Sequence, residues 1–205
     1  MARIVLILGG ARSGKSRFAE QLAERIGGAS VLFIATAQAS DLEMASRIEA
    51  HRNSRPRAWD TLETPMGVAG ALAATPDQYQ AVVIDCLTLL ASNVIVSCED
   101  PVDDKMTEKQ MRQEIHALLA ACRERQGAVI IVTNEVGEGL VPDNRLGRVF
   151  RDVLGWTNQA VAAEADAVYL MVAGLPVEVK SLAKSLEQAA EAVSSRRLEE
   201  GLWGR

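Results

Sequence analysis

The segment GGARSGKS, Gly9–Ser16, has residue types and a spacing that could bind a ligand, and it directly follows a short apolar run. Its glycines let the backbone curl so that successive N–H groups point at phosphate oxygens. Lys15 is placed to reach terminal phosphates, and the hydroxyl of Ser16 suits a magnesium ion. A tight structural turn is the alternative interpretation. We favour a site for a nucleoside triphosphate with Mg²⁺, built from Gly9, Gly10, Ala11, Arg12, Ser13, Gly14, Lys15 and Ser16.

Polar side chains also end two later apolar runs. In AVVIDCLTLL, Asp85 follows four apolar residues, where a carboxylate could orient the metal and its waters. The alternative is that Asp85 caps the next helix. The run AVIIVTNEVG ends in Thr133, Asn134 and Glu135, and such residues face the ligand crevice of an open α/β sheet. Glu135 either positions a water or hydroxyl, or is a solvated loop carboxylate.

His51 is one of two histidines and stands beside three arginines, Arg52, Arg55 and Arg57, at the expected end of a helix. A neutral imidazole can attack phosphorus, and neighbouring guanidiniums can stabilise the charge on the phosphate oxygens. A solvated surface histidine is the commoner reason for such a residue. The other histidine, His116, adjoins an apolar helical stripe and is expected to be a helix-surface residue.

Short apolar runs alternate with amphipathic stretches along the chain. This alternation predicts an α/β fold with a mainly parallel sheet flanked by helices, and Gly174 between the last two runs predicts an antiparallel edge hairpin. The expected strands are Ile4–Leu8, Val31–Ala35, Ala81–Ile84, Ala128–Val132, Ala167–Val172 and Val177–Val179, and the expected helices are Lys15–Ile26, Asp41–Glu49, Leu87–Val96, Thr107–Arg125 and Asn144–Ala165.

Bulk properties limit the classes of function. The 205 residues suit one domain, expected at 1–180, with a helical extension at 181–205 whose apolar residues pack on the domain or on another subunit. A net charge of −5 argues against a nucleic-acid partner. Three cysteines without CxxC spacing suit a reducing compartment and offer no zinc site, and no apolar run is long enough for a membrane span. We expect a cytoplasmic protein.

Several blocks, in this order, closely resemble the bifunctional adenosylcobinamide kinase / adenosylcobinamide-phosphate guanylyltransferase family of cobalamin biosynthesis. They are GGARSGKS, FIATA, EMASRIEAHRNSRP, VVIDCLTLLASN, VTNEVGEGLVP and VYLMVAGLP. The resemblance spans about residues 3 to 180. The HRxxRP and NEVG…VP blocks are more specific than the phosphate loop, Gly9–Ser16, alone. The tail extends past the usual end of the family.

The resemblance implies a RecA-like P-loop NTPase fold, a homotrimer and two reactions. A nucleoside triphosphate, GTP with ATP as an alternative, phosphorylates adenosylcobinamide, and GTP then gives GMP to adenosylcobinamide phosphate through a GMP-histidine intermediate. The products are adenosylcobinamide-GDP and pyrophosphate. The family motifs make His51 and Lys15 catalytic and give Ser16 and Asp85 to Mg²⁺. They add to the nucleotide site Ala35, Thr36, Ala37, Arg52, Asn53, Ser54, Arg55, Glu63 and Asp85.

Two other functions remain open on the residues alone. One is a P-loop small-molecule kinase in which His51 binds phosphate without forming a covalent bond. The other is a non-enzymatic nucleotide-binding or assembly module. A regulatory GTPase is disfavoured, because the chain reads DCLT and TNEV where DxxG and NKxD would be expected. Arg145, Arg148 and Arg151 either line the corrinoid surface or form a solvated charged face.

Overall fold

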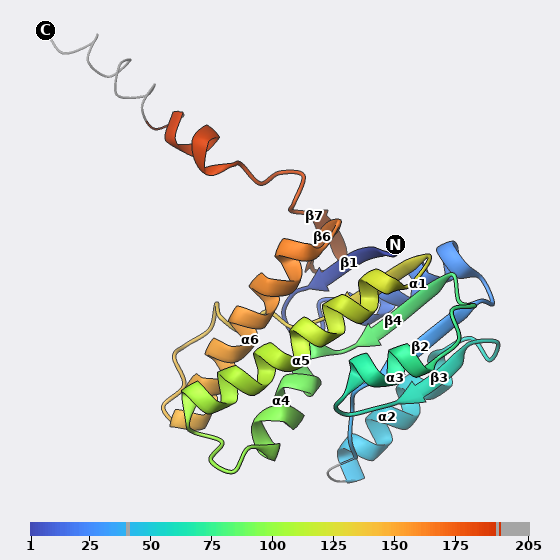
Figure 1. Cartoon of the computed structure of the whole chain (residues 1–205), viewed down its shortest axis with the longest axis horizontal. Coiled ribbons are helices and arrows are strands. Elements are labelled where there is room, and N and C mark those ends of the chain that lie inside the picture. The colour runs from blue at the N-terminus through green and yellow to red at the C-terminus, as the bar shows by residue number, and fades with distance from the viewer. Residues whose placement is uncertain (40–41, 192, 194–205) are drawn as a thin grey trace, which may run out of the picture.

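The computed structural model describes residues 1–39, 42–191 and 193, and leaves the side chains of residues 43, 47 and 54 outside the description. Its centre is a seven-stranded sheet in the order β3-β2-β4-β5-β1-β6-β7 (Figure 1). Every neighbouring pair is parallel except β6 and β7, which form an antiparallel hairpin. The strands are β1 (Arg3–Leu8), β2 (Val31–Ala35), β3 (Asp60–Glu63), β4 (Ala81–Asp85), β5 (Ala128–Val132), β6 (Ala167–Val172) and β7 (Leu175–Glu178).

Helices cover both faces of the sheet, and strand residues alternate between two hydrophobic clusters. Ile4 and Leu6 of β1 join the cluster under α3 to α6, whereas Ile7 joins the cluster under α1. Burial on both faces explains why the central strands are continuous apolar runs. The helices are α1 (Lys15–Gly27), α2 (Leu42–Ser54), α3 (Val68–Ala74), α4 (Leu87–Ser97), α5 (Asp104–Glu124) and α6 (Arg145–Glu164).

The predicted fold class is confirmed, with three differences in the elements. Strand β3 was not expected, because Asp60–Glu63 is mostly polar and exposed at the sheet edge, where apolar side chains are not required. The seven-residue helix α3 is too short for a clear helical period. Helix α2 continues to Ser54 instead of ending at Glu49, so His51 lies within its last turn and not at the boundary with a loop.

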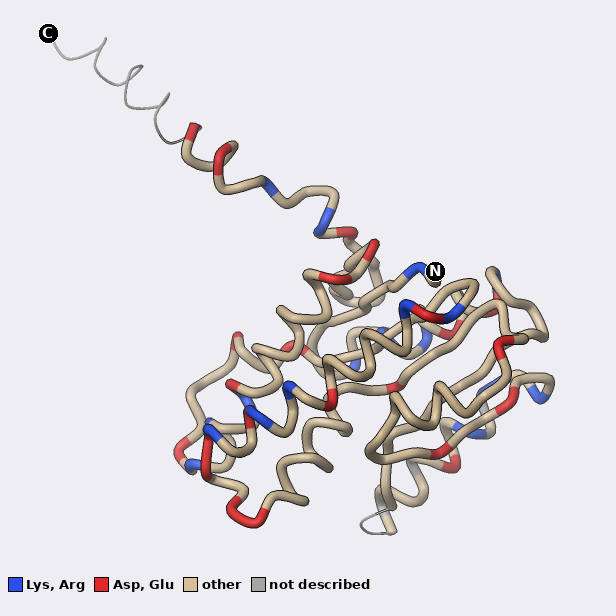
Figure 2. Tube along the Cα trace, in the orientation of Figure 1, with Lys and Arg blue, Asp and Glu red and all other residues tan. Residues whose placement is uncertain are grey.

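The segment after β7 leaves the domain, as Figure 1 shows. Residues 186–191 are helical, but Leu182 and Leu186 are 70% and 82% exposed. The expectation that these residues pack on the domain is therefore wrong for the described part of the tail. We find no stretch of helix, within the residues described, that combines the length and apolar character needed to cross a bilayer. Figure 2 shows acidic and basic residues intermixed along the described chain.

Candidate functional site

The phosphate loop connects β1 to α1 at the carboxyl end of the sheet. Gly14 precedes the helix at a φ of 97°, and Gly9 has a φ of 149°, conformations that favour glycine. A Cβ at Gly9 would lie 2.7 Å from the carbonyl oxygen of Met171, so β6 leaves no room for a side chain there. The amide of Gly174, in the β6–β7 turn, donates to the Ser13 carbonyl at 2.9 Å. The edge hairpin thus supports the loop from one side.

Two polar groups of the loop suit a bound phosphate. Lys15 is 7% exposed, and its ammonium donates to the Gly10 carbonyl at 2.6 Å. Burial lowers the pKa of Lys15, while the nearby Cys86 and Asp85 oppose that shift. The buried hydroxyl of Ser13 has no hydrogen-bond partner among the described residues. A polyanion would give the Ser13 hydroxyl a hydrogen-bond partner and the Lys15 ammonium an additional one.

A cavity of about 370 Å³ opens beside the loop. From the predicted site it is lined by Ala11, Arg12, Lys15, Ser16, Ala35, Ala37, His51, Arg55 and Asp85. These residues come from the end of β2 and the segment after it, from the end of β4, from the phosphate loop, and from α2 and the residue that follows it. The structure therefore brings the histidine block and the phosphate loop to one cavity, although they are far apart in the sequence.

The remaining predicted residues lie outside that lining. Gly9, Gly10 and Gly14 belong to the phosphate loop, and Thr36 is fully buried. The Thr36 hydroxyl donates to the Cys86 carbonyl at 2.7 Å and accepts from the Cys86 amide at 2.8 Å. Arg52 and Asn53 are exposed, and Arg52 forms an ion pair with the exposed Glu63. The side chain of Ser54 falls outside the described residues.

Helix α2 presents Met44, Ile48 and His51 to the cavity, and Arg55, directly after the end of the helix, continues this stripe. The spacing of i, i+4 and i+7 places the first three residues on one helical face. Sequence reasoning had named the last two and missed the first two, although this spacing was visible in the chain. The stripe gives the cavity an apolar end next to its histidine and arginine.

Arg55, at the end of this stripe, is half-buried. Its guanidinium carbon lies 3.5 Å from the centre of the Phe33 ring, and its Nε is buried without a hydrogen-bond partner among the described residues. Burial lowers the pKa of Arg55, and the carboxylates of Asp85 and Glu20 oppose this shift. An arginine held on an aromatic face with donors still available is well suited to phosphate oxygens.

Asp85 ends β4 and lines the cavity with its carboxylate. Capping of the next helix, the alternative interpretation, does not occur: the N-cap of α4 is Cys86, and no side chain caps it. Burial raises the pKa of the Cys86 thiol to about 11, so this cysteine is protonated at neutral pH. No cluster of three or more potential metal-binding His, Cys, Asp or Glu side chains occurs among the residues that the structure describes. A magnesium ion would depend on Ser16, Asp85 and the nucleotide itself.

Sequence reasoning also left open the roles of Glu135 and the three arginines of α6. Glu135 accepts a hydrogen bond from the Gly137 amide at 2.6 Å, which stabilises the turn after β5. Arg148 donates to the Pro142 carbonyl at 2.9 Å, and Arg151 donates to the Gly137 carbonyl at 2.7 Å. These two arginines hold the loop before α6.

The comparisons with known proteins agree with this geometry. The model of the family described as cobinamide kinase / cobinamide phosphate guanyltransferase matches residues 5–179. The chain is 43% identical to the bifunctional adenosylcobalamin biosynthesis protein CobU of Escherichia coli, over 86% of this chain and 99% of that protein. It is 45% identical to the bifunctional adenosylcobalamin biosynthesis protein CobP of Pseudomonas aeruginosa, over 85% and 96% of the two chains.

Similarity to solved structures is more remote. A KaiC-like protein from Pyrococcus horikoshii aligns with a TM-score of 0.40 and 18% identity, over 82% of this chain and 70% of that chain. An ATPase domain aligns with a TM-score of 0.49 and 16% identity, over 82% and 68% of the two chains. The family match covers most of the sequence, and the relatives are matched over nearly their full lengths. The chain belongs to the cobinamide kinase / cobinamide phosphate guanyltransferase family.

Proposed function

We propose that this protein phosphorylates adenosylcobinamide and then transfers GMP from GTP to adenosylcobinamide phosphate through a GMP-His51 intermediate. The observation that carries the proposal is that His51 lines the same cavity as Lys15 and Asp85. A kinase that only transfers the γ-phosphoryl group needs the phosphate loop. It does not need a histidine nucleophile in the same cavity. The names of the relatives, which are bifunctional, also support two activities.

The first reaction moves the γ-phosphoryl group of a nucleoside triphosphate, GTP or ATP. The hydroxyl oxygen of the substrate forms a bond to the γ-phosphorus, and the bond from that phosphorus to the β–γ bridging oxygen breaks. The nucleoside diphosphate leaves with the electron pair, and the hydroxyl proton passes to solvent. Lys15 and the loop amides stabilise the phosphate oxygens during transfer. Mg²⁺, held by Ser16 and Asp85, would neutralise charge on the β- and γ-phosphates.

The second reaction takes place at the α-phosphorus of GTP. An imidazole nitrogen of His51 bonds to that phosphorus, and the bond from the phosphorus to the α–β bridging oxygen breaks. Pyrophosphate leaves with the electron pair, and the imidazole proton passes to solvent. A phosphate oxygen of adenosylcobinamide phosphate then attacks the same phosphorus, which breaks the P–N bond and yields adenosylcobinamide-GDP. Arg55 is placed to stabilise the non-bridging oxygens in both halves. Met44 and Ile48 supply apolar surface for the guanine base.

The test is incubation with GTP labelled at the α-phosphate, followed by denaturation and detection of acid-labile label on the protein. His51→Asn removes the nucleophile, and we expect it to abolish labelling. His116→Asn is the matched control, because His116 lies on α5 against Trp156 and does not line the cavity. This control should label like the unmodified chain.

Two results would contradict the proposal in different ways. Phosphorylation of cobinamide without any protein labelling would indicate the plain small-molecule kinase. Nucleotide binding without turnover of cobinamide would indicate a non-enzymatic module. We further propose that the protein acts as a cytoplasmic homotrimer, as its family resemblance implies. The free thiols of Cys86, Cys98 and Cys122 support a reducing compartment.

A further inference from the structure

Asn134 lies at the carboxyl end of β5, between the strand of the phosphate loop and the strand of Asp85. Its amide donates to the Thr88 hydroxyl at 2.8 Å, and its carbonyl accepts from the Asn158 carboxamide at 2.9 Å. The next amide, that of Glu135, donates to the Gly9 carbonyl of the phosphate loop at 3.0 Å. The backbone of Asn134 is thus fixed to α4, to α6 and to the loop itself.

The side chain of Asn134, unlike its backbone, is not held by hydrogen bonds to the described residues. It lines the cavity, and its carboxamide makes no hydrogen bond to any residue that the structure describes. A carboxamide combines two N–H donors with an acceptor oxygen. A fixed backbone with an available carboxamide next to the phosphate loop is the arrangement expected of a group that meets a ligand.

Asn158 connects this residue to the interior of the protein. It lies on α6, is 6% exposed, and accepts from the fully buried Thr133 hydroxyl at 2.8 Å while donating to Asn134. Both ends of its carboxamide are therefore engaged, and the hydrogen bonds fix which end faces Asn134. Polar groups this deeply buried are costly unless they are fully paired. The pairing here orients the backbone of a single cavity residue.

We propose that Asn134 is a catalytic residue of the phosphorylation step and that Asn158 positions it. This inference rests on the proposed function. The Nδ2 group donates to an oxygen of the γ-phosphoryl group, while Oδ1 accepts from the substrate hydroxyl as its oxygen bonds to the γ-phosphorus. The bond to the β–γ bridging oxygen breaks, the nucleoside diphosphate takes the electron pair, and the hydroxyl proton goes to solvent.

The sheet order explains why one reaction should depend on Asn134 more than the other. Strand β5 is directly beside the strand that carries the phosphate loop, and its end is bonded to Gly9. His51 is carried by α2, which follows β2, and β4 separates β2 from β5. Asn134 is therefore placed for chemistry at the phosphate that the loop holds. His51 approaches from the other side.

The experiment compares two variants in both reactions. Asn134→Ala removes the carboxamide from the cavity, and Asn158→Asp keeps the shape of the side chain but loses the donor to the Asn134 carbonyl. Phosphorylation of cobinamide gives kcat and KM, α-labelled GTP gives the rate of His51 labelling, and a non-hydrolysable GTP analogue gives a Kd. Thr157→Val is the control, because Thr157 is the buried neighbour on α6 whose hydroxyl bonds within its own helix, to the Val153 carbonyl.

We expect Asn134→Ala to lower kcat of phosphorylation about 100-fold, the scale of losing one positioned donor, with KM and analogue Kd changed by less than about 3-fold. Asn158→Asp should lower kcat about 10-fold, because the carboxamide that it orients is still present. In both variants, the fold-decrease in kcat of phosphorylation should exceed the fold-decrease in the rate of His51 labelling by about 10-fold or more. Thr157→Val should leave both rates unchanged.

Each other outcome counts against a particular statement. Equal losses in phosphorylation and labelling would mean that the asparagines are structural, and unchanged phosphorylation in Asn134→Ala would remove it from catalysis. If Asn158→Asp does not fold, Asn134→Ala still decides, since its side chain lies in the cavity and makes no described hydrogen bond that could be lost. An unmodified chain that fails to phosphorylate cobinamide would overturn the proposed function itself, and this inference with it.

Discussion

Glu20, on the helix that follows the phosphate loop, illustrates how the site sets the ionisation of its neighbours. Burial raises the pKa of this carboxyl group, and the nearby guanidinium of Arg55 opposes the shift without cancelling it. The pKa in the folded state therefore lies above that of the unfolded chain. The contribution of Glu20 to stability is fully present below the unfolded pKa of about 4.3 and is lost as the pH rises through the folded value.

Replacement by glutamine should reveal this dependence. Glu20→Gln keeps the shape and removes the charge, so the stability of the variant relative to the unmodified chain should increase as the pH is raised from about 4 to 7. Urea unfolding at several pH values measures the difference. Glu24→Gln, which changes an exposed residue of the same helix, is the matched control, and the change of the stability difference with pH should be larger for Glu20→Gln than for this control. If the stability difference does not change with pH for either variant, the environment of Glu20 does not raise its pKa.

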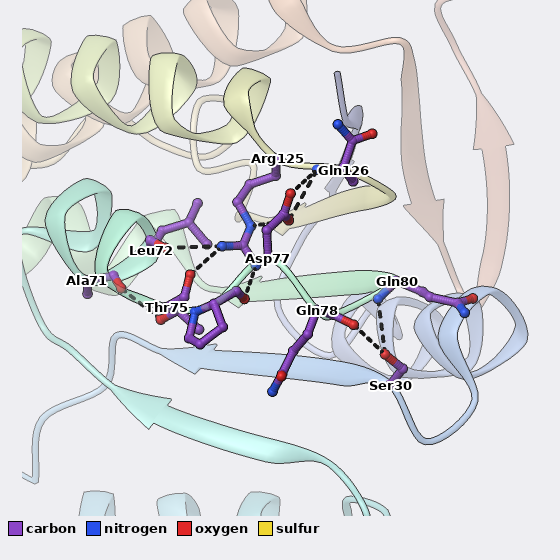
Figure 3. A network of polar contacts seen from close by, with 10 residues as sticks. Ser30, Ala71, Leu72, Thr75, Asp77, Gln78, Gln80, Arg125 and Gln126 are labelled. Carbon is purple, nitrogen blue, oxygen red and sulfur yellow. Dashed lines mark hydrogen bonds and ion pairs between the residues drawn. The ribbon is translucent and has the colours of Figure 1, made fainter.

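At the scale of elements, the end of the sheet opposite the cavity is held by a buried arginine. Arg125 follows α5 and is 5% exposed. It donates to the Thr75 carbonyl at 2.7 Å and the Pro76 carbonyl at 2.9 Å, and its Nε forms an ion pair with Asp77 at 3.2 Å. Figure 3 shows this network joining the end of α3 to the turn before β5. The two turns that lead into β4 and β5 are thereby fixed together.

Removing this guanidinium should therefore cost stability and spare the site. We expect Arg125→Met to lower the free energy of unfolding by about 3 kcal/mol, because it removes the buried donor to the Thr75 and Pro76 carbonyls and the cation beside Asp77. Arg123→Met, which removes a more exposed ion pair with Asp166, should cost less than about 1 kcal/mol. Denaturant unfolding measures both values. Equal losses, or a changed nucleotide affinity in Arg125→Met, would contradict this account.

Elements with a strong apolar signal could be predicted from the sequence, and those stabilised by their neighbours could not. The buried strands and α1 follow from apolar runs and the phosphate-loop motif. Strand β3 is polar, and it forms because β2 offers a free edge. The site divides in the same way. His51 and Asp85 lie in recognisable sequence patterns. Asn158 instead contacts Asn134, which is 24 residues away in the sequence, and no local pattern marks it.

At the scale of the whole molecule, we expect the domain and the described part of the tail to contribute separately to stability. Residues 184–191 are exposed, and the family match ends at residue 179. Just before them, Lys180 donates to the Ala162 carbonyl at 3.1 Å, and the Leu182 amide donates to the Val179 carbonyl at 3.2 Å. Burial of apolar surface is what stabilises a fold, and the described tail buries little of it.

A chain that ends at Ala183 tests this separation. We expect its Tm to stay within about 2 °C of the full chain, because little buried surface is lost. Both reactions should persist, and light scattering should give the mass of a trimer for both chains. Dissociation of the truncated chain would instead assign the tail to the subunit contact that its apolar spacing had suggested. A large fall in Tm without dissociation would mean that the tail packs on its own domain.

The bond between the Gly174 amide and the Ser13 carbonyl makes the edge hairpin a natural observation point. Gly174 is outside the cavity lining, so a nucleotide in the cavity need not touch it. Its amide is nevertheless hydrogen-bonded to the phosphate loop, so its chemical shift should change when the loop moves. In a nitrogen–proton correlation spectrum, this single glycine resonance would report the state of the loop during each of the two reactions, without a probe inside the site.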